Sequence, residues 1–173
     1  MSPDLIQLLN GDGDLDGRLT ALMPLLCREL DCDRCALFLR DPETLLSRMT
    51  HAWARAPEFE LAREDRGWTP QSPTLVEDDP MFAEALVNPE ALYIEDIETA
   101  DPALVNAPYE REHFGHRALV HAPLFHEGAM YGILEPCVFG EPRIWTVSNR
   151  ETVSGVQRAL APLAARYVAE NAG

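Results

Sequence analysis

The chain has 173 residues, 46% of them hydrophobic, and a formal net charge of −15. This length and composition fit one compact domain with a buried core. The negative charge repels polyanions, so neither nucleic acid nor an anionic membrane is expected as a partner. No apolar stretch is long enough to cross a bilayer, and the N-terminus lacks the basic start of a secretory signal. The expected location is cytoplasmic.

Two helices are expected at the N-terminal end. Residues 1–14 form an N-terminal arm, in which Ser2 and Pro3 start a short helix that ends at Gly11. The leucines that follow recur at intervals of three and four, which places them on one face of a second helix. They are Leu15, Leu19, Leu22, Leu26 and Leu30. This face must be buried, and Pro24 within the helix predicts a kink.

Two antiparallel hairpins are predicted farther along the chain. Residues 35–40 and 45–53 are apolar segments joined by the turn Asp-Pro-Glu-Thr, a pattern typical of two paired strands. Residues 118–125 and 130–139 form the second hairpin around a His-Glu-Gly turn. A shorter strand covers residues 91–97, between the two hairpins.

The remaining segments are connections and a final helix. Residues 54–78 are rich in proline and show no period, so they predict a long connection, and such connections are often functional. Asp79 starts a short helix, and residues 98–116 are irregular or briefly helical. Ser148 and Glu151 form a capping box for the last helix. One face of that helix carries Val153, Val156, Leu160, Leu163 and Tyr167.

Hairpins in place of alternating crossovers predict an α+β protein with an antiparallel sheet. The two terminal helices are expected on one face of this sheet and the long loops on the other. Such an arrangement leaves a pocket between the sheet and the loops.

The second half of the chain carries motifs of a known family. The run RALVHAPLFHEGAMYGILEP (117–136) holds a small-apolar strand ending in Pro-Leu, a glycine turn and a Gly-Ile-Leu strand, and PRIWT (142–146) leads into the last helix. In these features the chain resembles the GAF family over residues 15–170, as a single domain. The resemblance implies a PAS/GAF/profilin-like sheet of five to six strands, with terminal helices on one face and a pocket under loops and short helices on the other. These motifs report the fold and not the ligand.

The resemblance implies a sensing or regulatory role and not an enzymatic one. Members of the family usually hold a cyclic nucleotide, tetrapyrrole, haem or metabolite between the sheet and the loops, and the output would pass through self-association or a protein partner. Bilin-binding relatives attach the chromophore through a cysteine that is followed by histidine. The corresponding segment, YEREHFGHRALV (109–120), contains His113 and His116 but no cysteine. No covalent bilin is therefore expected, and the identity of any cofactor stays open.

The four cysteines predict neither an enzyme nor a metal site. Cys32 and Cys35 form a CxxC, but no second CxxC or HxxxH follows to complete a zinc site. The GAF-type methionine sulfoxide reductases need several cysteines in the loops over the pocket, and a reactive thiol must be accessible. Here Cys27 falls on a helix and Cys137 on the last strand. We therefore predict no catalytic residue and no metal, and a thiol-based reductase is the remaining enzymatic alternative.

Candidate pocket residues come mainly from the second hairpin and the segment before it. Period-two alternation places His121 on one face of its strand together with Leu119, Pro123 and Phe125. If this face looks into the pocket, the imidazole can bond a ligand; if not, it is a satisfied core histidine. Glu135 poses the same question on the neighbouring strand, because a carboxylate in an apolar run needs a partner. The other candidates are His113, His116, Trp68, Tyr109, Phe114 and Tyr131.

Two functions from different classes remain. In the first, the pocket binds a small molecule and its occupancy changes the loops and the terminal helices. In the second, the pocket is degenerate and the domain acts by protein contact, most simply as a homodimer through the apolar face of its last helix. That face is also the one expected to pack on the sheet.

Overall fold

A six-stranded antiparallel sheet forms the centre of the computed structural model, which describes residues 1–61 and 67–172. The strands lie in the order β3-β2-β1-β6-β5-β4. Their bounds are β1 (Arg34–Arg40), β2 (Leu46–Ala54), β3 (Thr69–Pro70), β4 (Leu92–Ile94), β5 (Ala118–His126) and β6 (Ala129–Val138). Both predicted hairpins and the antiparallel α+β sheet are confirmed. The two-residue strand β3, within the long connection, was not predicted.

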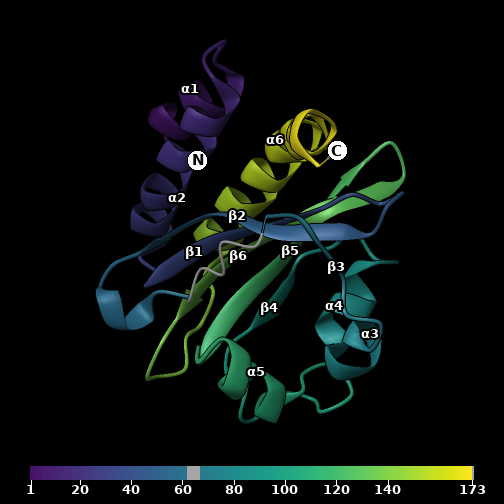
Figure 1. Ribbon diagram of the computed structural model, residues 1–173. Coiled ribbons are helices and arrows are strands. Elements are labelled where there is room, and N and C mark those ends of the chain that lie inside the picture. Colours follow the sequence, from purple (N-terminus) through teal and green to yellow (C-terminus); the bar gives the residue numbers. More distant parts are fainter. Residues whose placement is uncertain (62–66, 173) are drawn as a thin grey trace.

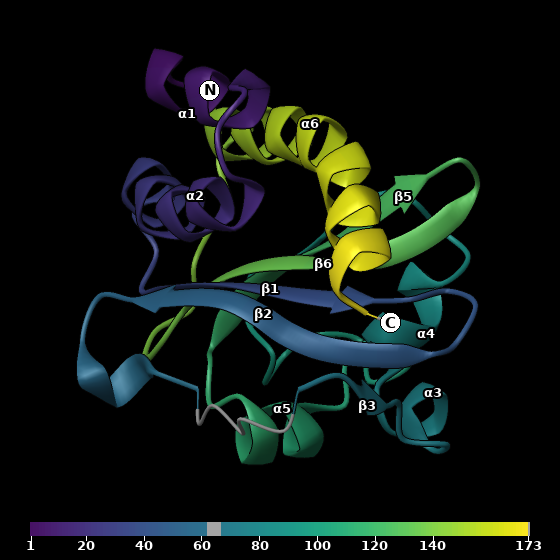
Figure 2. The same cartoon turned by 45° about the horizontal axis from the view of Figure 1, so that its top comes forward.

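Three helices lie on one side of the sheet (Figures 1 and 2). They are α1 (Pro3–Asn10), α2 (Leu15–Leu30) and α6 (Val147–Asn171). Helices α2 and α6 lie against the strands, and α1 packs on these two helices. The short helix predicted at the N-terminus is confirmed, with Ser2 as its N-cap. Because Leu5 and Leu9 are buried in the main core, the N-terminal arm packs on the helix layer and does not extend away from it.

The opposite face is covered by short helices and connections (Figure 2). These elements are η1 (Pro57–Phe59), α3 (Leu75–Asp78), α4 (Pro80–Ala85) and α5 (Ala107–His113). The predicted division is confirmed, with terminal helices on one face and loops on the other. Asp79 caps α4, as expected, by accepting a hydrogen bond from the backbone N–H of Phe82 at 3.0 Å.

Helix α2 buries the whole predicted leucine stripe. It runs as one helix through Pro24 and ends at Asp31, which adopts the left-handed conformation with φ 50°. The backbone N–H of Cys32 then returns to the carbonyl of Cys27 at 3.0 Å. This cap turns the chain directly into β1.

The start of α6 differs from the prediction by two residues. Thr146 is the N-cap, and its capping box is completed by Asn149 in place of the predicted pair Ser148 and Glu151. The side-chain carbonyl of Asn149 accepts a hydrogen bond from the Thr146 N–H, as a glutamate carboxylate would, so glutamate at the third position was not required. The apolar face of α6 packs on the sheet, and Val153, Val156 and Leu160 have no exposed surface.

Strands β5 and β6 form the most extensive pair of the sheet, and their register shifts between Pro123 and Phe125. Near the shift, Gly132 allows β6 to approach β1 closely. A Cβ at this position would overlap the carbonyl oxygen of Phe38. Among the helices of the described residues, none is both long and apolar enough to span a membrane.

A cavity with a buried polar floor

A cavity of about 160 Å³ lies on the loop-covered face of the sheet. Its walls come from β1, β2, β5 and β6 on the sheet side, and from the segments around α3, α4 and α5 on the other side. The lining is mostly apolar, with a small polar group at the floor, as is typical of ligand pockets. The lining residues are Phe38, Leu39, Arg40, Ser47, Gln71, Leu75, Asp79, Phe82, Tyr109, Phe114, His121, Met130, Gly132, Ile133 and Glu135.

Two histidines and two glutamates form a buried row at the floor of the cavity. His116 Nε2 lies 2.8 Å from Glu110 Oε2, and its Nδ1 lies 3.6 Å from Glu135 Oε1. His121 Nδ1 lies 3.6 Å from the other oxygen, Glu135 Oε2. The contact between His116 and Glu110 is a short hydrogen bond, whereas the two 3.6 Å contacts are electrostatic only. Glu135 is thus held between two imidazoles without a hydrogen bond to either.

Arg34 supplies the fixed positive charge of this row. It begins β1 and is 1% exposed. Its guanidinium donates hydrogen bonds to the carbonyl oxygens of Phe59 and Phe114 at 3.1 and 3.2 Å, and lies 3.4 Å from His116 Nδ1. The same group lies over the ring of Phe139, 4.9 Å from its centroid. A buried charge needs several such partners, and Arg34 obtains them from three separate segments.

Several polar atoms of the floor have no hydrogen-bond partner among the described residues. They are both ring nitrogens of His121, Oε1 of Glu135 and Nε of Arg34. Buried polar groups in folded proteins are nearly always paired, and an unpaired one costs about 1–3 kcal/mol. His121 and Glu135 both line the cavity, so these two residues are the members of the row nearest to a molecule inside it.

The pKa values of the two glutamates are shifted in opposite directions because their surroundings differ. Burial on its own raises the pKa of Glu135, but the two neighbouring histidines and Arg34 together hold that pKa below its ordinary value. Burial raises the pKa of Glu110, although the hydrogen bond from His116 opposes the shift. Glu135 is therefore the more readily ionised of the two carboxyl groups.

The roof of the cavity combines an acid and aromatic rings. Burial raises the pKa of Asp79. It also raises the pKa of Tyr109 to about 12, with the negative charge of Asp79 as the next cause. Phe114 packs edge-on against Phe38 with ring centroids 6.1 Å apart. The roof thus offers flat apolar surfaces, with one hydroxyl and one carboxyl group among them.

Four of the residues predicted from the sequence line this cavity: His121, Glu135, Tyr109 and Phe114. The alternation argument places His121 correctly, since Ala118, Val120, Ala122 and Leu124 belong to the core under the helices. His116 lies beside the cavity in the buried polar row and does not line it.

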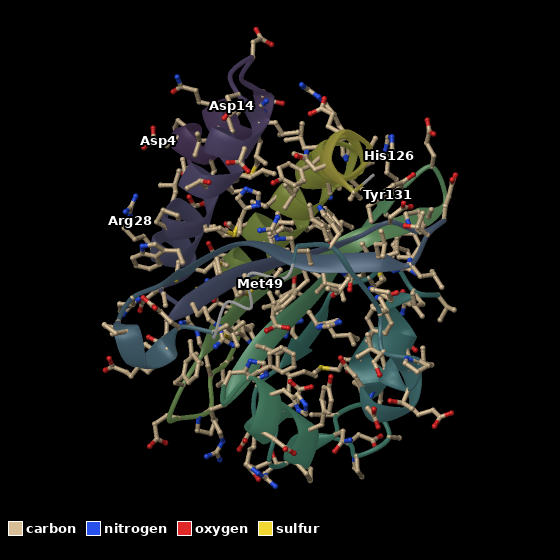
Figure 3. The ribbon with its side chains drawn as sticks, viewed as in Figure 1. Asp4, Asp14, Arg28, Met49, His126 and Tyr131 are labelled. Atoms are coloured by element: carbon tan, nitrogen blue, oxygen red, sulfur yellow. The ribbon has the colours of Figure 1, made fainter. Side chains whose placement is uncertain are left out.

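The structure places the other three candidates outside the cavity. Tyr131 packs against the core under the helices, because the register shift between β5 and β6 changes which residues of β6 face the loops. Figure 3 shows its label beside that of His126, next to α6. Trp68 also packs against this main core. His113 is exposed on α5 and stacks on Tyr109 with centroids 4.1 Å apart.

Sequence reasoning missed three members of the site: Arg34, Glu110 and Arg40. Arg34 and Arg40 are the two ends of an otherwise apolar strand, where arginine usually marks exposed ends of a strand. Glu110 lies in a short helix that is exposed at most of its other positions. A buried charge in such places has no local signal, because its partners are distant in the sequence.

One part of the row has donor atoms of the kinds that bind metals. Single ligand atoms of His116, Glu135 and Cys137 lie within 4.8 Å of one another. However, the guanidinium of Arg34 already lies 3.4 Å from His116 Nδ1, and Glu110 holds the other ring nitrogen. A fixed cation at this distance repels a metal ion, so the residues present do not fit a metal here.

Comparison with known proteins identifies the family. The family model that describes the GAF domain matches residues 14–162 of this chain. The chain belongs to the GAF family. GAF domains are often sensory or regulatory parts of signalling proteins, so the GAF assignment sets the general class of function. A comparison with curated proteins gives no match.

Solved GAF domains share the fold at low sequence identity. One is the GAF domain of a phosphoenolpyruvate-protein phosphotransferase from Coxiella burnetii, 17% identical with a TM-score of 0.71, covering 96% of this chain and 92% of that one. Another is GAF3 from Slr1393 of Synechocystis sp. PCC6803 in its photoproduct state, 22% identical with a TM-score of 0.66, covering 91% and 98%. A third is the PixJ GAF domain of Thermosynechococcus elongatus in its blue-light-absorbing form, 16% identical with a TM-score of 0.65, covering 98% and 93%. At these identities the likeness establishes the fold alone.

Proposed function

We propose that this GAF domain senses a small molecule that binds in the cavity against His121 and Glu135. The observation that carries the proposal is the set of unpaired polar atoms at the cavity floor. Keeping them buried without partners costs stability. A ligand that pairs with them recovers this cost on binding, which makes its affinity depend on those two side chains.

The size of the cavity limits the ligand class. A cavity of about 150 Å³ holds a benzene ring, and the cavity here measures about 160 Å³. Drug-sized ligands occupy roughly 300–1,000 Å³. The occupant is therefore a compact molecule, or the single-ring head of a longer one, and not an intact tetrapyrrole in the present shape of the cavity.

The polar floor defines the edge by which such a ring is recognised. Glu135 is a charged acceptor, so it selects an N–H or O–H donor of the ligand. His121 has one donor and one acceptor nitrogen when neutral, and it can pair with a neighbouring polar atom of the same edge. Phe114 and Phe82 supply apolar surface for the ring. The ligand class is a monocyclic heterocycle or phenol with a hydrogen-bond donor on its edge.

The output of sensing is proposed to pass through self-association or another protein, in the cytoplasm. Ligand contacts with α4 and the segment around α5 would bias their positions over the sheet. A homodimer through the terminal helices would have to use their outward side chains, since the apolar face of α6 is buried within the chain. The alternative is a GAF domain without a ligand that acts only as a dimerisation module.

The first experiment separates these functions. The purified full chain is measured by native mass spectrometry and absorbance, and is then tested by ligand-observed NMR against single-ring probes such as phenol, imidazole and 4-pyrimidinone. The sensor proposal predicts saturable binding of at least one probe. H121L removes both ring nitrogens and should lose this binding, whereas H126L, at a histidine of the same strand that does not line the cavity, should keep it.

Two outcomes of these measurements would contradict the sensor proposal. An empty, dimeric chain that binds none of the probes would favour the dimerisation module. Equal binding by wild type and H121L would place the ligand elsewhere on the molecule.

A further inference from the structure

Three cysteines meet on the side of the sheet opposite the cavity. Cys27 comes from the last turn of α2, Cys32 from the connection after it, and Cys35 from β1. All three have no exposed surface. Cys32 Sγ lies 3.2 Å from Cys27 Sγ and 4.0 Å from Cys35 Sγ, and the three sulfurs all lie within 4.8 Å of one another. The sequence motif CxxC supplies only two of them, and the fold adds the third.

The local backbone explains why the sulfurs converge. The left-handed residue Asp31 ends α2 and folds the chain back, so that the N–H of Cys32 bonds the carbonyl of Cys27. Cys35 follows on a strand whose alternation turns it toward the helices, into the main core. The cluster is therefore built by a helix cap and the first strand, two rigid elements.

The spacing of the sulfurs matches that of a metal–thiolate site. With metal–sulfur bonds of about 2.3 Å, ligand sulfurs lie about 3.8 Å apart in a tetrahedral site and about 4.0 Å apart in a trigonal one. The sulfur–sulfur distance of 3.2 Å between Cys27 and Cys32 is shorter than these values, and the distance of 4.0 Å between Cys32 and Cys35 matches the trigonal one.

The charge environment also suits a cation. The cluster lies at the C-terminal end of α2, where the helix dipole is negative. The carbonyl oxygen of Cys32 lies 3.0 Å from Cys27 Sγ and also accepts a hydrogen bond from Arg55 at 2.9 Å, so the three sulfurs are the ligands on which the site depends.

We propose that Cys27, Cys32 and Cys35 form a buried three-thiolate site for one thiophilic d¹⁰ metal ion, Zn²⁺ or Cu⁺. Soft thiolate ligands select these ions over hard cations. Three sulfurs alone satisfy a trigonal Cu⁺ site, whereas Zn²⁺ takes a fourth ligand, and the Cys32 carbonyl could serve only by giving up its hydrogen bond from Arg55. On binding, three metal–sulfur bonds form, the three cysteines give up their thiol protons to the buffer, and no redox step is required.

The site is independent of the cavity function. Its ligands link α2 to the start of β1, so a bound metal would fasten the helix layer to the sheet. Metal affinity then adds to the free energy of unfolding, because the unfolded chain does not preserve the site.

The test uses the full chain, reduced, treated with chelator and handled without oxygen. Separate samples receive one equivalent of Zn²⁺ or of Cu⁺ and are desalted, and the metal content is measured by elemental mass spectrometry. The proposal predicts one retained equivalent of one of the two ions and a higher thermal midpoint than in the metal-free chain. C32S should retain no metal, while C137S, at a buried cysteine outside the cluster, should retain the full equivalent.

X-ray absorption at the metal edge of the wild-type protein gives a readout that does not depend on a variant that folds. Three sulfur neighbours at about 2.3 Å are expected. Failure of the reduced wild type to retain either ion would overturn the proposal. So would nitrogen and oxygen neighbours alone, equal metal loss in C137S and C32S, or a mass that shows a Cys27–Cys32 disulfide in place of bound metal.

Discussion

Asp79 has two roles that can be separated by a pair of substitutions. Its side chain caps α4, the helix that carries Phe82 to the cavity, and its carboxyl group is buried at the cavity wall. D79N keeps a capping oxygen and removes the charge, whereas D79A removes both. Comparing the two variants isolates the cap, because neither contains a carboxylate.

The cap sets the size of the first effect. Replacing an N-cap acid or amide by alanine costs about 1 kcal/mol, within a range of about 0.5–2. D79A should therefore be less stable than D79N by about 1 kcal/mol at every pH. For a domain of this size this corresponds to a difference in thermal midpoint of about 2–4 °C. Urea unfolding followed by tryptophan fluorescence measures the free energies directly.

The charge sets the pH dependence. Burial raises the pKa of Asp79 in the folded chain, so the folded state binds this proton more tightly than the unfolded state does. The contribution of Asp79 to stability is thus greatest below its unfolded pKa and falls as the pH rises through its folded pKa. D79N lacks this loss, and its stability relative to the wild type should increase from pH 4 upward. Equal stability of D79A and D79N, or a relative decline of D79N with rising pH, would refute this account of the site.

Three further predictions concern the scaffold. G132A should destabilise the domain by at least about 1–3 kcal/mol in urea unfolding, because its Cβ overlaps the backbone at Phe38; wild-type stability would show that β1 and β6 are not in such close contact. W145F removes a buried hydrogen bond to a β4 carbonyl and should lower the free energy of unfolding by about 1–3 kcal/mol. An unchanged unfolding midpoint would contradict this prediction. Hydrogen bonding from Tyr167 lowers the pKa of Asp16, so Y167F should raise it in a carboxyl NMR titration, and an unmoved titration would exclude that bond.

The general architecture was predictable because it depends on local patterns. Leucines at helical spacing, two alternating hairpins and capping residues each specify an element from neighbours in the chain. The alternation of β5 was enough to place His121 on the cavity side. The alternation was not enough to predict the environment of His121, because its charged neighbour Glu135 belongs to another strand.

The failures have two physical causes. Tyr131 was misplaced because a register shift reverses the facing of a strand. Gly132, near the shift, was the residue of the sequence that could have signalled it. The polar row and the cysteine cluster were missed because they depend on long-range packing. Arg34 meets His116 across 82 positions, and Cys27 joins the CxxC only through the helix cap.

The most direct test of the cavity account is ¹⁵N NMR of the histidine ring nitrogens, with the His121 signals assigned by comparison with H121L. The protein is titrated with whichever single-ring probe binds it most tightly. The account predicts saturable shifts at His121, with His126, which does not line the cavity, unaffected. Unchanged His121 signals at full occupancy would contradict it.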